Sequence, residues 1–472
     1  MQKLLLTTIG IFFCAVLHAQ GYNITVKLKG YNSGTLYLGH YMGKSTYLMD
    51  SAQISPAGVA VLKGTEKALG GIYLIVLPGR QRYFEMLLDK QQTFSIAVDS
   101  ADLLKGTVYT GSPDNDLFLN YNKSLAGMEA ENQEIQRLLA LRTKADTAKA
   151  ASAQQAMFKK IQAKREEIIS QHPKALLSAI FKLMKDPEVP ATLPKKADGT
   201  ADSTFPYRYY KSHYWDFTDL TDGRLVRTPV FENKLQKYFS QLVVPEADSI
   251  NAEADRILAK ARPDKEMFKF VLWWLTNTYE TSPYMGMDAV FVHLVEKYYV
   301  AGDATWLTED QKNKIISRAY TIAPNLIGQP AAPLVLEDST GKPVSLYNIK
   351  GKYTILVFWD PTCGHCKTEI PRIDSAYKAI WKDKGIAVLG VKTEGTKDEW
   401  VSFVKQHKLT GWTHALDPQN KSNYRRLYDV YSTPVIYLLD EKKKIIAKRL
   451  GVEQLIGFLQ HLDTQATKTV SN

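Results

Sequence analysis

The chain has 472 residues, of which 45% are hydrophobic and 23% charged, and its formal charge at pH 7 is +11. This length allows two to four domains with separate cores, and the composition is that of an ordinary soluble globular protein. The positive charge would suit a nucleic acid or an anionic membrane, but no run of five basic residues occurs. The densest cluster, Lys442 to Lys444, follows Asp440 and Glu441 and is typical of a hairpin turn. We therefore expect a solvated basic surface and no nucleic-acid partner.

The first 20 residues have the pattern of a secretory signal peptide. Lys3 gives a positive start, residues 4–17 are almost wholly apolar, and Ala19 supplies a small residue at the cleavage point. Cys14 lies in the apolar stretch without the small neighbour of a lipoprotein signal, which makes a lipid anchor the less favoured alternative. The sequence therefore predicts export and a place in the periplasm or cell envelope.

Residues 21–115 have the alternating pattern of β-strands. Ile24, Val26 and Leu28 alternate with polar residues, as in a strand with one buried face. Further strands are expected over residues 35–41, 72–77, 83–88, 93–98 and 106–110, separated by turns. The pattern predicts an N-terminal antiparallel β-sandwich, in which no catalytic constellation is visible.

Residues 116–325 have helical patterns and are predicted to form an all-α domain. Glu129 to His172 should form one or two long amphipathic helices, interrupted around Asp146 and Thr147. Shorter helices are expected over residues 264–279, 287–299 and 308–319.

An aromatic stretch stands out in this region. Tyr207, Tyr210, Tyr214 and Phe217 recur at helical spacing. A packing face is the favoured interpretation, because packing requires that period, and a binding surface is the alternative. His213 is interpreted as a structural group rather than a ligand.

Residues 326–472 change character again, after a proline-rich boundary at residues 327–333. Tyr353 to Trp359 is a continuous apolar run, typical of a buried parallel strand, and a second buried strand follows over residues 386–391. Helices are expected over residues 397–407, 422–429 and 452–462, and a hairpin over residues 434–449. The order of these elements predicts an α/β fold whose first two strands are parallel and central.

Cys363 and Cys366, separated by Gly364 and His365, are the only cysteines after the predicted signal peptide. A disulfide across so small a loop stabilises a fold very little, which argues against a structural staple. The pair lies between a buried strand and a helix, where the helix N-terminus favours the thiolate. Because the thiolate attacks in disulfide exchange, we expect Cys363 to be the exposed nucleophile and Cys366 the buried resolving thiol. His365 adds a donor that stabilises the Cys363 thiolate.

Residues outside the motif sharpen this prediction. Glu369 lies three residues after Cys366 on the same helix face and is expected to take its proton; a first-turn acid that complements the helix dipole is the alternative. Pro371 lies inside the helix and removes one backbone hydrogen bond. A cis bond between Thr433 and Pro434 would place the proline against the dithiol and free the Thr433 backbone to pair with an extended substrate. The alternative is a trans proline that opens a strand.

Together these motifs resemble the TlpA/ResA-like thiol-disulfide oxidoreductases of the thioredoxin superfamily. The resemblance covers residues 326–472 and is carried by the lead-in GQPAAPLVLEDSTGKPVSL, the strand YTILVFWDPTC, Cys363 to Cys366, Glu369 with Pro371, and Thr433 with Pro434. It implies a thioredoxin fold, Cys363 as nucleophile, Cys366 as resolving thiol and a cis Pro434. The first 325 residues more weakly resemble the regions that precede such domains in Bacteroidetes-type envelope proteins, which implies no chemistry for them.

The sequence departs from ordinary thioredoxin in three places. Val357 stands where thioredoxin has a buried aspartate, and Glu369 is similar to this subfamily's replacement for it. Thr362 stands where a tryptophan is usual. The dipeptide Gly364-His365 is similar to that of protein disulfide isomerase, which implies a potential nearer about −180 than about −270 mV and leaves the direction of electron flow open.

Other uses of the dithiol fit the sequence less well. A zinc site needs further ligands, and no second CxxC motif exists. Haem attachment needs His directly after the second cysteine, where Lys367 stands. A thiol peroxidase shares the fold, but Pro361-Thr362 does not match the pattern before its cysteine. A remaining alternative is a partner- or glycan-binding envelope protein whose thioredoxin domain only senses redox state.

The sequence thus predicts a signal peptide (1–20), a β-sandwich domain (21–115), a helical domain (116–325) and a thioredoxin-like domain (326–472). The dithiol is expected to reduce or exchange disulfides of envelope proteins, with Gly364, His365, Thr433 and Pro434 binding the substrate. Neither a metal nor an organic cofactor is needed. Electrons are expected from another thiol protein, linked to the membrane, because the periplasm has no thiol buffer of its own.

Overall fold

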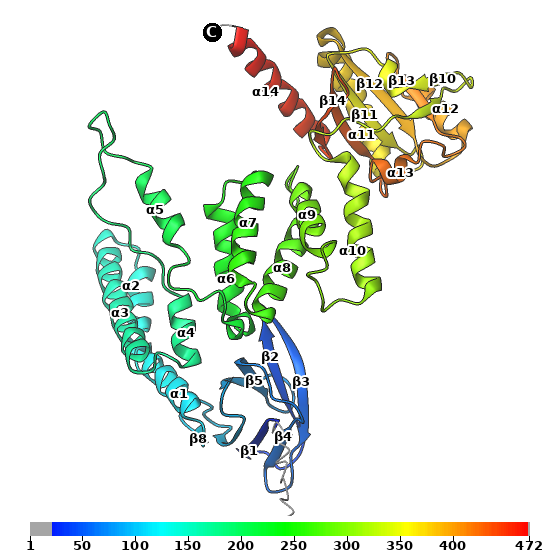
Figure 1. Cartoon of the computed structure of the whole chain (residues 1–472). Helices are drawn as coiled ribbons and strands as arrows, with labels where there is room; N and C mark the ends of the chain where they lie inside the picture. Colours follow the sequence, from blue (N-terminus) through cyan, green and yellow to red (C-terminus); the bar gives the residue numbers. More distant parts are fainter. Residues whose placement is uncertain (1–20, 471–472) are drawn as a thin grey trace, which may run out of the picture. The chain divides into compact units, whose positions relative to one another are not determined.

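The computed structural model describes residues 21–470, so the predicted signal peptide and Cys14 lie outside the described residues. The described chain forms two compact units. The first comprises the residues up to Val243 together with Lys260–Phe268, and the second comprises Val244–Ala259 and the residues from Lys269 onward. The thioredoxin-like region and the last helices before it therefore belong to one unit (Figure 1).

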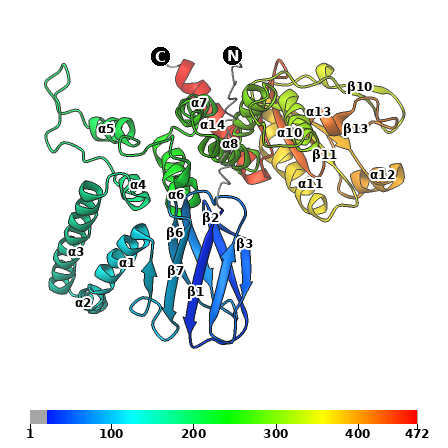
Figure 2. The same ribbon diagram turned by 60° about the horizontal axis from the view of Figure 1, so that its bottom comes forward.

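A β-sandwich opens the first unit (Figure 2). One sheet has the order β4 (Val59–Lys63), β1 (Asn23–Lys29), β7 (Thr93–Asp99), β8 (Val108–Thr110), and the other has the order β3 (Ser45–Gln53), β2 (Thr35–Met42), β5 (Gly71–Val76), β6 (Tyr83–Leu88). Ile24, Val26 and Leu28 of β1 are buried, as their alternation predicted. All strand pairs are antiparallel except β1 with β7, which is parallel. The predicted antiparallel sandwich is confirmed apart from that pair.

Helices make up the rest of the first unit: α1 (Pro113–Ala126), α2 (Glu129–Ala140), α3 (Lys144–Gln171), α4 (Leu176–Leu183), α5 (Phe205–His213), the 3-10 turn η1 (Gly223–Arg227), α6 (Pro229–Lys237) and the π-helical turn η2 (Tyr238–Leu242). The long helices α2 and α3 are as predicted, but the expected interruption around Asp146 and Thr147 is wrong. The break lies at residues 141–143, because the Thr143 side chain accepts a hydrogen bond from the Asp146 N–H (3.1 Å) and caps α3.

The aromatic stretch around α5 does not form one buried face, so the packing-face interpretation is wrong for most of it. α5 ends at His213, and Tyr214, just after it, is 1% exposed. Tyr207, inside α5, is 45% exposed, and Phe217, beyond the end of the helix, is 41% exposed. His213 stacks on Tyr209, with ring centroids 4.0 Å apart. Among the described residues, no group of three or more His, Cys, Asp or Glu is placed to hold a metal ion.

Helices also open the second unit: α7 (Ala247–Ala261), whose last two residues belong to the first unit, α8 (Lys265–Glu280), whose first four residues belong to the first unit, then α9 (Asp288–Leu294), the π-helical turn η3 (Val295–Tyr299), α10 (Glu309–Ile322) and the 3-10 turn η4 (Ala323–Asn325). Three predicted helices are confirmed here, one of them divided between α9 and η3. A capping box between Thr308 and Gln311 starts α10. Over the described part of the chain, no helix is both long enough and apolar enough to span a membrane.

The C-terminal region is an α/β fold around a seven-stranded sheet with the order β10 (Pro343–Ser345), β9 (Val335–Glu337), β13 (Thr413–Leu416), β12 (Ile386–Lys392), β11 (Tyr353–Trp359), β14 (Val435–Asp440), β15 (Ile445–Lys448). Its helices are α11 (Gly364–Ala376), α12 (Lys397–Gln406), α13 (Tyr424–Leu427) and α14 (Val452–Val470). β11 and β12 are parallel and lie inside the sheet, as predicted. The expected thioredoxin-like fold is therefore confirmed, and β9, β10 and β13 are strands that the sequence pattern does not predict.

The alternation of β11 places the second cysteine in a core. Val357 and Trp359 belong to one apolar cluster, and Phe358 belongs to another, because successive side chains of a strand point to opposite faces of the sheet. Cys366 and Ile370 of α11 belong to the same cluster as Val357. This packing holds the first turn of α11 at the carboxyl end of β11.

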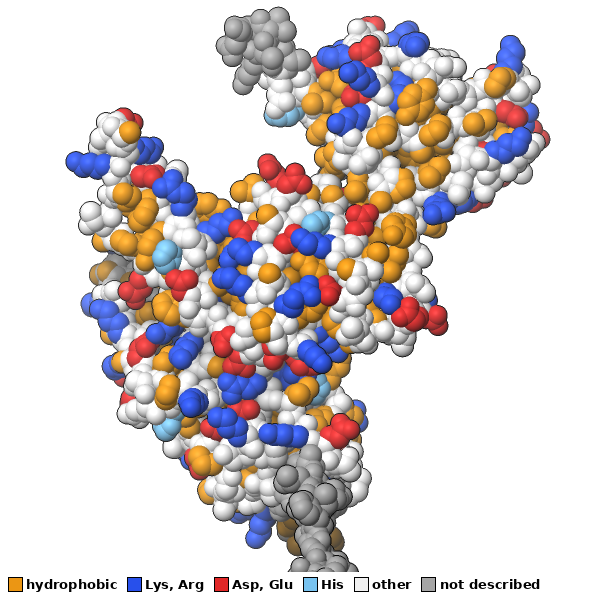
Figure 3. All heavy atoms as spheres, viewed as in Figure 1, with side chains coloured by type: hydrophobic (Ala, Val, Ile, Leu, Met, Phe, Trp, Pro, Cys, Tyr) orange, Lys and Arg blue, Asp and Glu red, His pale blue; other side chains and the backbone are white. Residues whose placement is uncertain are grey.

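The predicted hairpin joins β14 to β15, but its lysines are not all solvated. Lys443 is 3% exposed, and its Nζ donates a hydrogen bond to Thr354 Oγ1 (2.8 Å). The expectation of a solvated turn is therefore wrong for this residue. Elsewhere, basic and acidic side chains are intermixed over the face of the molecule shown in Figure 3.

The proline-rich segment of residues 327–333 pairs with the edge of the sheet, since Gly328 N–H donates to a carbonyl of β15 (2.8 Å). On the same strand, Lys448 has a side chain that is 4% exposed. Its Nζ donates to O (2.8 Å) and Oδ1 (2.9 Å) of Asn325 and pairs with Asp288. A buried lysine thus joins the helical segment of the second unit to the sheet.

Candidate active site

β11 and α11 meet at the cysteine motif. Cys363 is the N-cap residue of α11, with φ −69° and ψ 128°. The Asp360 carboxylate accepts hydrogen bonds from N–H and Oγ1 of Thr362, both at 2.7 Å, and so fixes the turn between strand and helix. Gly364 is exposed, and a Cβ at this position would meet no atom within 4 Å. The motif therefore presents its first thiol at an open end of the helix.

The two cysteines are free thiols in different surroundings. Cys363 is partly exposed, whereas Cys366 is fully buried. The Cys363 thiol donates to the carbonyl oxygen of Thr433, with Sγ and O 3.4 Å apart. The peptide bond between Thr433 and Pro434 is cis, as the resemblance implied. The fold therefore brings the cis-proline loop, 70 positions further along the chain, against the first cysteine.

The surroundings of Cys363 favour its thiolate. Partial burial raises the pKa of this thiol, but hydrogen bonds with the backbone N–H of Cys366, with Thr433, with the Cys366 thiol and with the backbone N–H of His365 together outweigh burial, so the pKa lies below the ordinary 9.0. These N–H groups belong to the first turn of α11 and have no partner within the helix. His365 thus acts on the sulfur through its backbone, and its imidazole is exposed.

Burial dominates at Cys366 and raises the pKa of its thiol to about 12. The side chain lies in the apolar cluster that includes Val357, Ile370 and Ile436. An apolar environment penalises the charged form, so this thiol holds its proton firmly near neutral pH. Cys366 therefore needs a proton acceptor before it can attack another sulfur.

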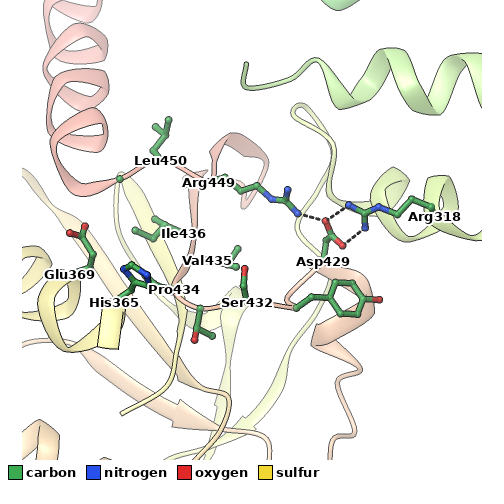
Figure 4. Close-up of a pocket in the computed structure, with 13 residues that line it drawn as sticks. Arg318, His365, Glu369, Asp429, Ser432, Pro434, Val435, Ile436, Arg449 and Leu450 are labelled. Carbon is green, nitrogen blue, oxygen red and sulfur yellow. Dashed lines mark hydrogen bonds and ion pairs between the residues drawn. The ribbon is translucent and has the colours of Figure 1, made fainter. Parts of the chain in front are cut away.

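Glu369 is the sixth residue of α11, so the alternative of an acid in the first helical turn is wrong. Its side chain is 23% exposed and accepts a hydrogen bond from Arg372 Nη1 (2.8 Å). Within the described residues, the carboxylate is bonded to Arg372 and not to Cys366. Glu369 and His365 line one cavity beside Pro434 (Figure 4).

That cavity has a volume of about 590 Å³ and lies along the cis-proline loop, β14 and the loop between β15 and α14 (Figure 4). Of its lining residues, the sequence predicts His365, Glu369, Thr433 and Pro434 as site residues, and it does not predict Arg318, Asp429 and Arg449. Arg318 contacts Asp429 across 111 positions of the chain. No local pattern marks such a long-range contact, so the sequence carried no signal for it.

Comparison with known proteins identifies the family. Residues 327–448 match the model of the AhpC/TSA family, residues 169–325 match a domain of unknown function (DUF5106), and residues 22–118 match another (DUF4369). Thiol-disulfide oxidoreductase ResA of Bacillus cereus is 32% identical over 139 residues, which cover 29% of this chain and 78% of that protein. The chain belongs to the ResA-like thiol-disulfide oxidoreductases.

Other relatives of this ResA-like protein have similar names. Sporulation thiol-disulfide oxidoreductase A of Bacillus subtilis is 35% identical over 127 residues, which cover 26% of this chain and 74% of that protein. A crystal structure of a domain of a possible thiol-disulfide isomerase from Cytophaga hutchinsonii is 40% identical and covers 31% of this chain and 99% of that one, with a TM-score of 0.29. The ResA-like protein is an oxidoreductase, as the sequence predicted.

Proposed function

We propose that this ResA-like protein reduces or exchanges disulfides of cell-envelope proteins through the Cys363–Cys366 dithiol. The observation that carries the proposal is the contrast between the two thiols. Cys363 is partly exposed and has a lowered pKa, and Cys366 is buried and has a raised pKa. An accessible thiolate attacks the substrate, and a shielded thiol in the same helical turn resolves the product without competing for substrate.

In the reducing direction, the Cys363 thiolate attacks one sulfur of a substrate disulfide. The substrate S–S bond breaks, a mixed disulfide with Cys363 forms, and the leaving thiolate takes a proton from water. Cys366 then gives up its proton and attacks Cys363 Sγ, which releases the second substrate thiolate and forms the Cys363–Cys366 disulfide. The substrate gains two electrons and becomes a dithiol, and the reverse sequence oxidises a substrate dithiol.

Glu369 is the proposed acceptor of the Cys366 proton. It follows Cys366 by three residues on α11, so the two side chains leave the helix on the same side. The carboxylate lines the cavity and is partly exposed, which lets it pass the proton on to water. Arg372 orients this carboxylate, and an exposed ion pair of this kind is easily broken.

The substrate is proposed to lie over Gly364 and His365 and along Thr433 and Pro434. Gly364 leaves open space beside Cys363, and His365 is exposed. The Thr433 carbonyl lies 3.4 Å from the nucleophilic sulfur, so a substrate strand that pairs with this backbone brings its disulfide to Cys363.

The proposal includes export by the predicted signal peptide and an electron supply from a membrane-linked thiol protein. A periplasm kept oxidising offers no thiol buffer, so a dithiol that reduces substrates there must be reduced by a dedicated donor. The Gly-His dipeptide favours a potential near that of isomerases, about −180 mV, at which reduction and rearrangement of disulfides both proceed.

The test is turnover of insulin disulfides by the full-length protein with dithiothreitol as electron donor. Turnover is expected in the wild type and is expected to be lost in Cys363→Ser and in Cys366→Ser. A wild-type protein that is oxidised and reduced once per molecule, without turnover, would favour the redox-sensing, partner- or glycan-binding alternative. Faster turnover of hydrogen peroxide than of insulin would favour a thiol peroxidase.

A further inference from the structure

At one end of the cavity, two arginines share one buried carboxylate (Figure 4). The Asp429 side chain is 2% exposed, and its two oxygens accept hydrogen bonds from Nη1 and Nη2 of Arg318, the second at 3.1 Å. Arg449 donates to Oδ2 of the same carboxylate. The backbone of Asp429 has φ 50°, a left-handed conformation that residues other than glycine seldom adopt. The two guanidinium groups therefore hold Asp429 at the start of the cis-proline loop.

Arg318 enters this site from outside the thioredoxin-like region. It lies on α10, which belongs to the same compact unit as the sheet. Lys448, the neighbour of Arg449 in the chain, bonds to Asn325 just after α10 and so fixes the helix against the sheet. The position of Arg318 in the cavity is thus built into the fold of the second unit.

Arg318 and Arg449 have N–H donors that do not bond to Asp429, and together with Asp429 they carry a net positive charge. Each guanidinium has five N–H groups, and Asp429 takes two from Arg318 and one from Arg449. The side chains of Arg318 and Arg449 are 32% and 53% exposed. Two cations face one anion here; Glu280 acts on Arg318 through space but does not line the cavity. Glu369, the other acid that lines it, is paired with Arg372.

We propose that Arg318 and Arg449 form a carboxylate-binding subsite for the substrate of the dithiol. This inference rests on the proposed function, because the subsite shares its cavity with His365 and Pro434. The subsite takes an acidic side chain of an extended protein segment, since guanidinium groups bind carboxylates through paired, charge-assisted hydrogen bonds. Arg318 makes the helical segment before the thioredoxin-like region part of the substrate-binding surface.

The test uses the full-length protein and two peptides. Each peptide carries one disulfide to a chromogenic thiol, and the two differ only in having Glu or Lys at the second and third positions after the cysteine. The wild type is expected to reduce the Glu peptide about twofold to fivefold faster in kcat/KM, which is what one partly exposed ion pair contributes. The preference should shrink at about 1 M salt, where such charges are screened.

The variants Arg318→Gln and Arg449→Gln are expected to bring the Glu-to-Lys ratio close to one. The matched control is Arg426→Gln, which removes the same charge from an exposed arginine that does not line the cavity. This control should keep the wild-type ratio. Because Arg449 is half-exposed, its variant tests the subsite even where Arg318→Gln weakens folding.

Equal rates for both peptides in the wild type, or an unchanged ratio in Arg449→Gln, would overturn the subsite. A neutral small substrate, hydroxyethyl disulfide, separates this failure from failure of the proposed function. The wild type and the control Arg426→Gln should reduce it at the same rate, because it has no carboxylate to bind and Arg426 does not line the cavity. A wild-type protein that does not reduce even this substrate would overturn the proposed function itself.

Discussion

The two cysteines of the reduced protein are predicted to differ in reactivity by several orders of magnitude. A pKa of about 12 leaves roughly one Cys366 thiol in 10⁵ ionised at pH 7. The rise from 9.0 to about 12 corresponds to about 4 kcal/mol in favour of the thiol form. The pKa of Cys363 is lowered instead, because hydrogen bonds with N–H groups of the first turn of α11, with Thr433 and with the Cys366 thiol outweigh its partial burial.

Alkylation by iodoacetamide measures this difference, because only the thiolate reacts. Reduced full-length protein is treated with iodoacetamide at a series of pH values from about pH 5 to about pH 10, and each modified cysteine is located by mass spectrometry. Native protein should be modified at Cys363 alone, with a rate that rises through a midpoint below 9.0. Cys366 should react only after denaturation. The variant Cys366→Ser is the matched control and should keep the fast thiol.

The free energy of unfolding of the reduced protein should also depend on the ionisation of Cys366. The pKa of Cys366 is higher in the folded than in the unfolded chain, so the unfolded chain loses this proton first as pH rises. The contribution of the protonated Cys366 thiol to the free energy of unfolding is therefore fully present below about pH 9 and is lost between about pH 9 and about pH 12. Alkylation of Cys366 as fast as Cys363 in native protein, or a Cys363 midpoint at or above 9.0, would show that the two thiols do not differ as predicted.

Two further variants test the roles of Glu369 and Lys448. Glu369→Gln should slow resolution of the mixed disulfide about 10²-fold, measured by quenched flow. The control Glu453→Gln removes the other carboxylate bonded to Arg372 and should not slow this step. Equal rates of resolution in the two variants would contradict proton transfer to Glu369. Lys448→Met should lower the free energy of unfolding by about 3–5 kcal/mol, because it leaves Asp288 without its buried cation. The control Lys442→Met, in the exposed turn, should change the free energy of unfolding by less than about 0.5 kcal/mol. Equal urea midpoints for Lys448→Met and Lys442→Met would show that the hydrogen bonds of Lys448 do not join helix and sheet.

Much of the thioredoxin-like region is predictable because its signals are local. Tyr353 to Trp359 is an unbroken apolar run, and β11 has the same bounds. The burial of Cys366 and the exposure of Cys363 follow from helix geometry. Cys366, the third residue of α11, faces the sheet, whereas Cys363, the N-cap residue, does not. These features need no knowledge of distant contacts.

Features set by distant contacts are not predictable in this way. β3 has mostly exposed side chains and no alternation of apolar residues, and only its pairing with β2 defines it as a strand. Lys443 lies in a run of three lysines, the pattern of a solvated turn, yet it is buried because Thr354 of β11 accepts its hydrogen bond. Arg318 reaches the candidate site across 111 positions, and nothing in α10 distinguishes it from a surface arginine.

The proposed mechanism requires that the thiolate of Cys363 attacks substrate disulfides and that Cys366 releases the product. Its most direct test is trapping of the intermediate: full-length Cys366→Ser is mixed with an oxidised protein that has one disulfide, and the products are separated without reductant. We predict a covalent adduct through Cys363, released by dithiothreitol, and no adduct with Cys363→Ser under the same conditions. Failure of Cys366→Ser to form the adduct, or an adduct of equal yield through Cys366 in Cys363→Ser, would be incompatible with this mechanism.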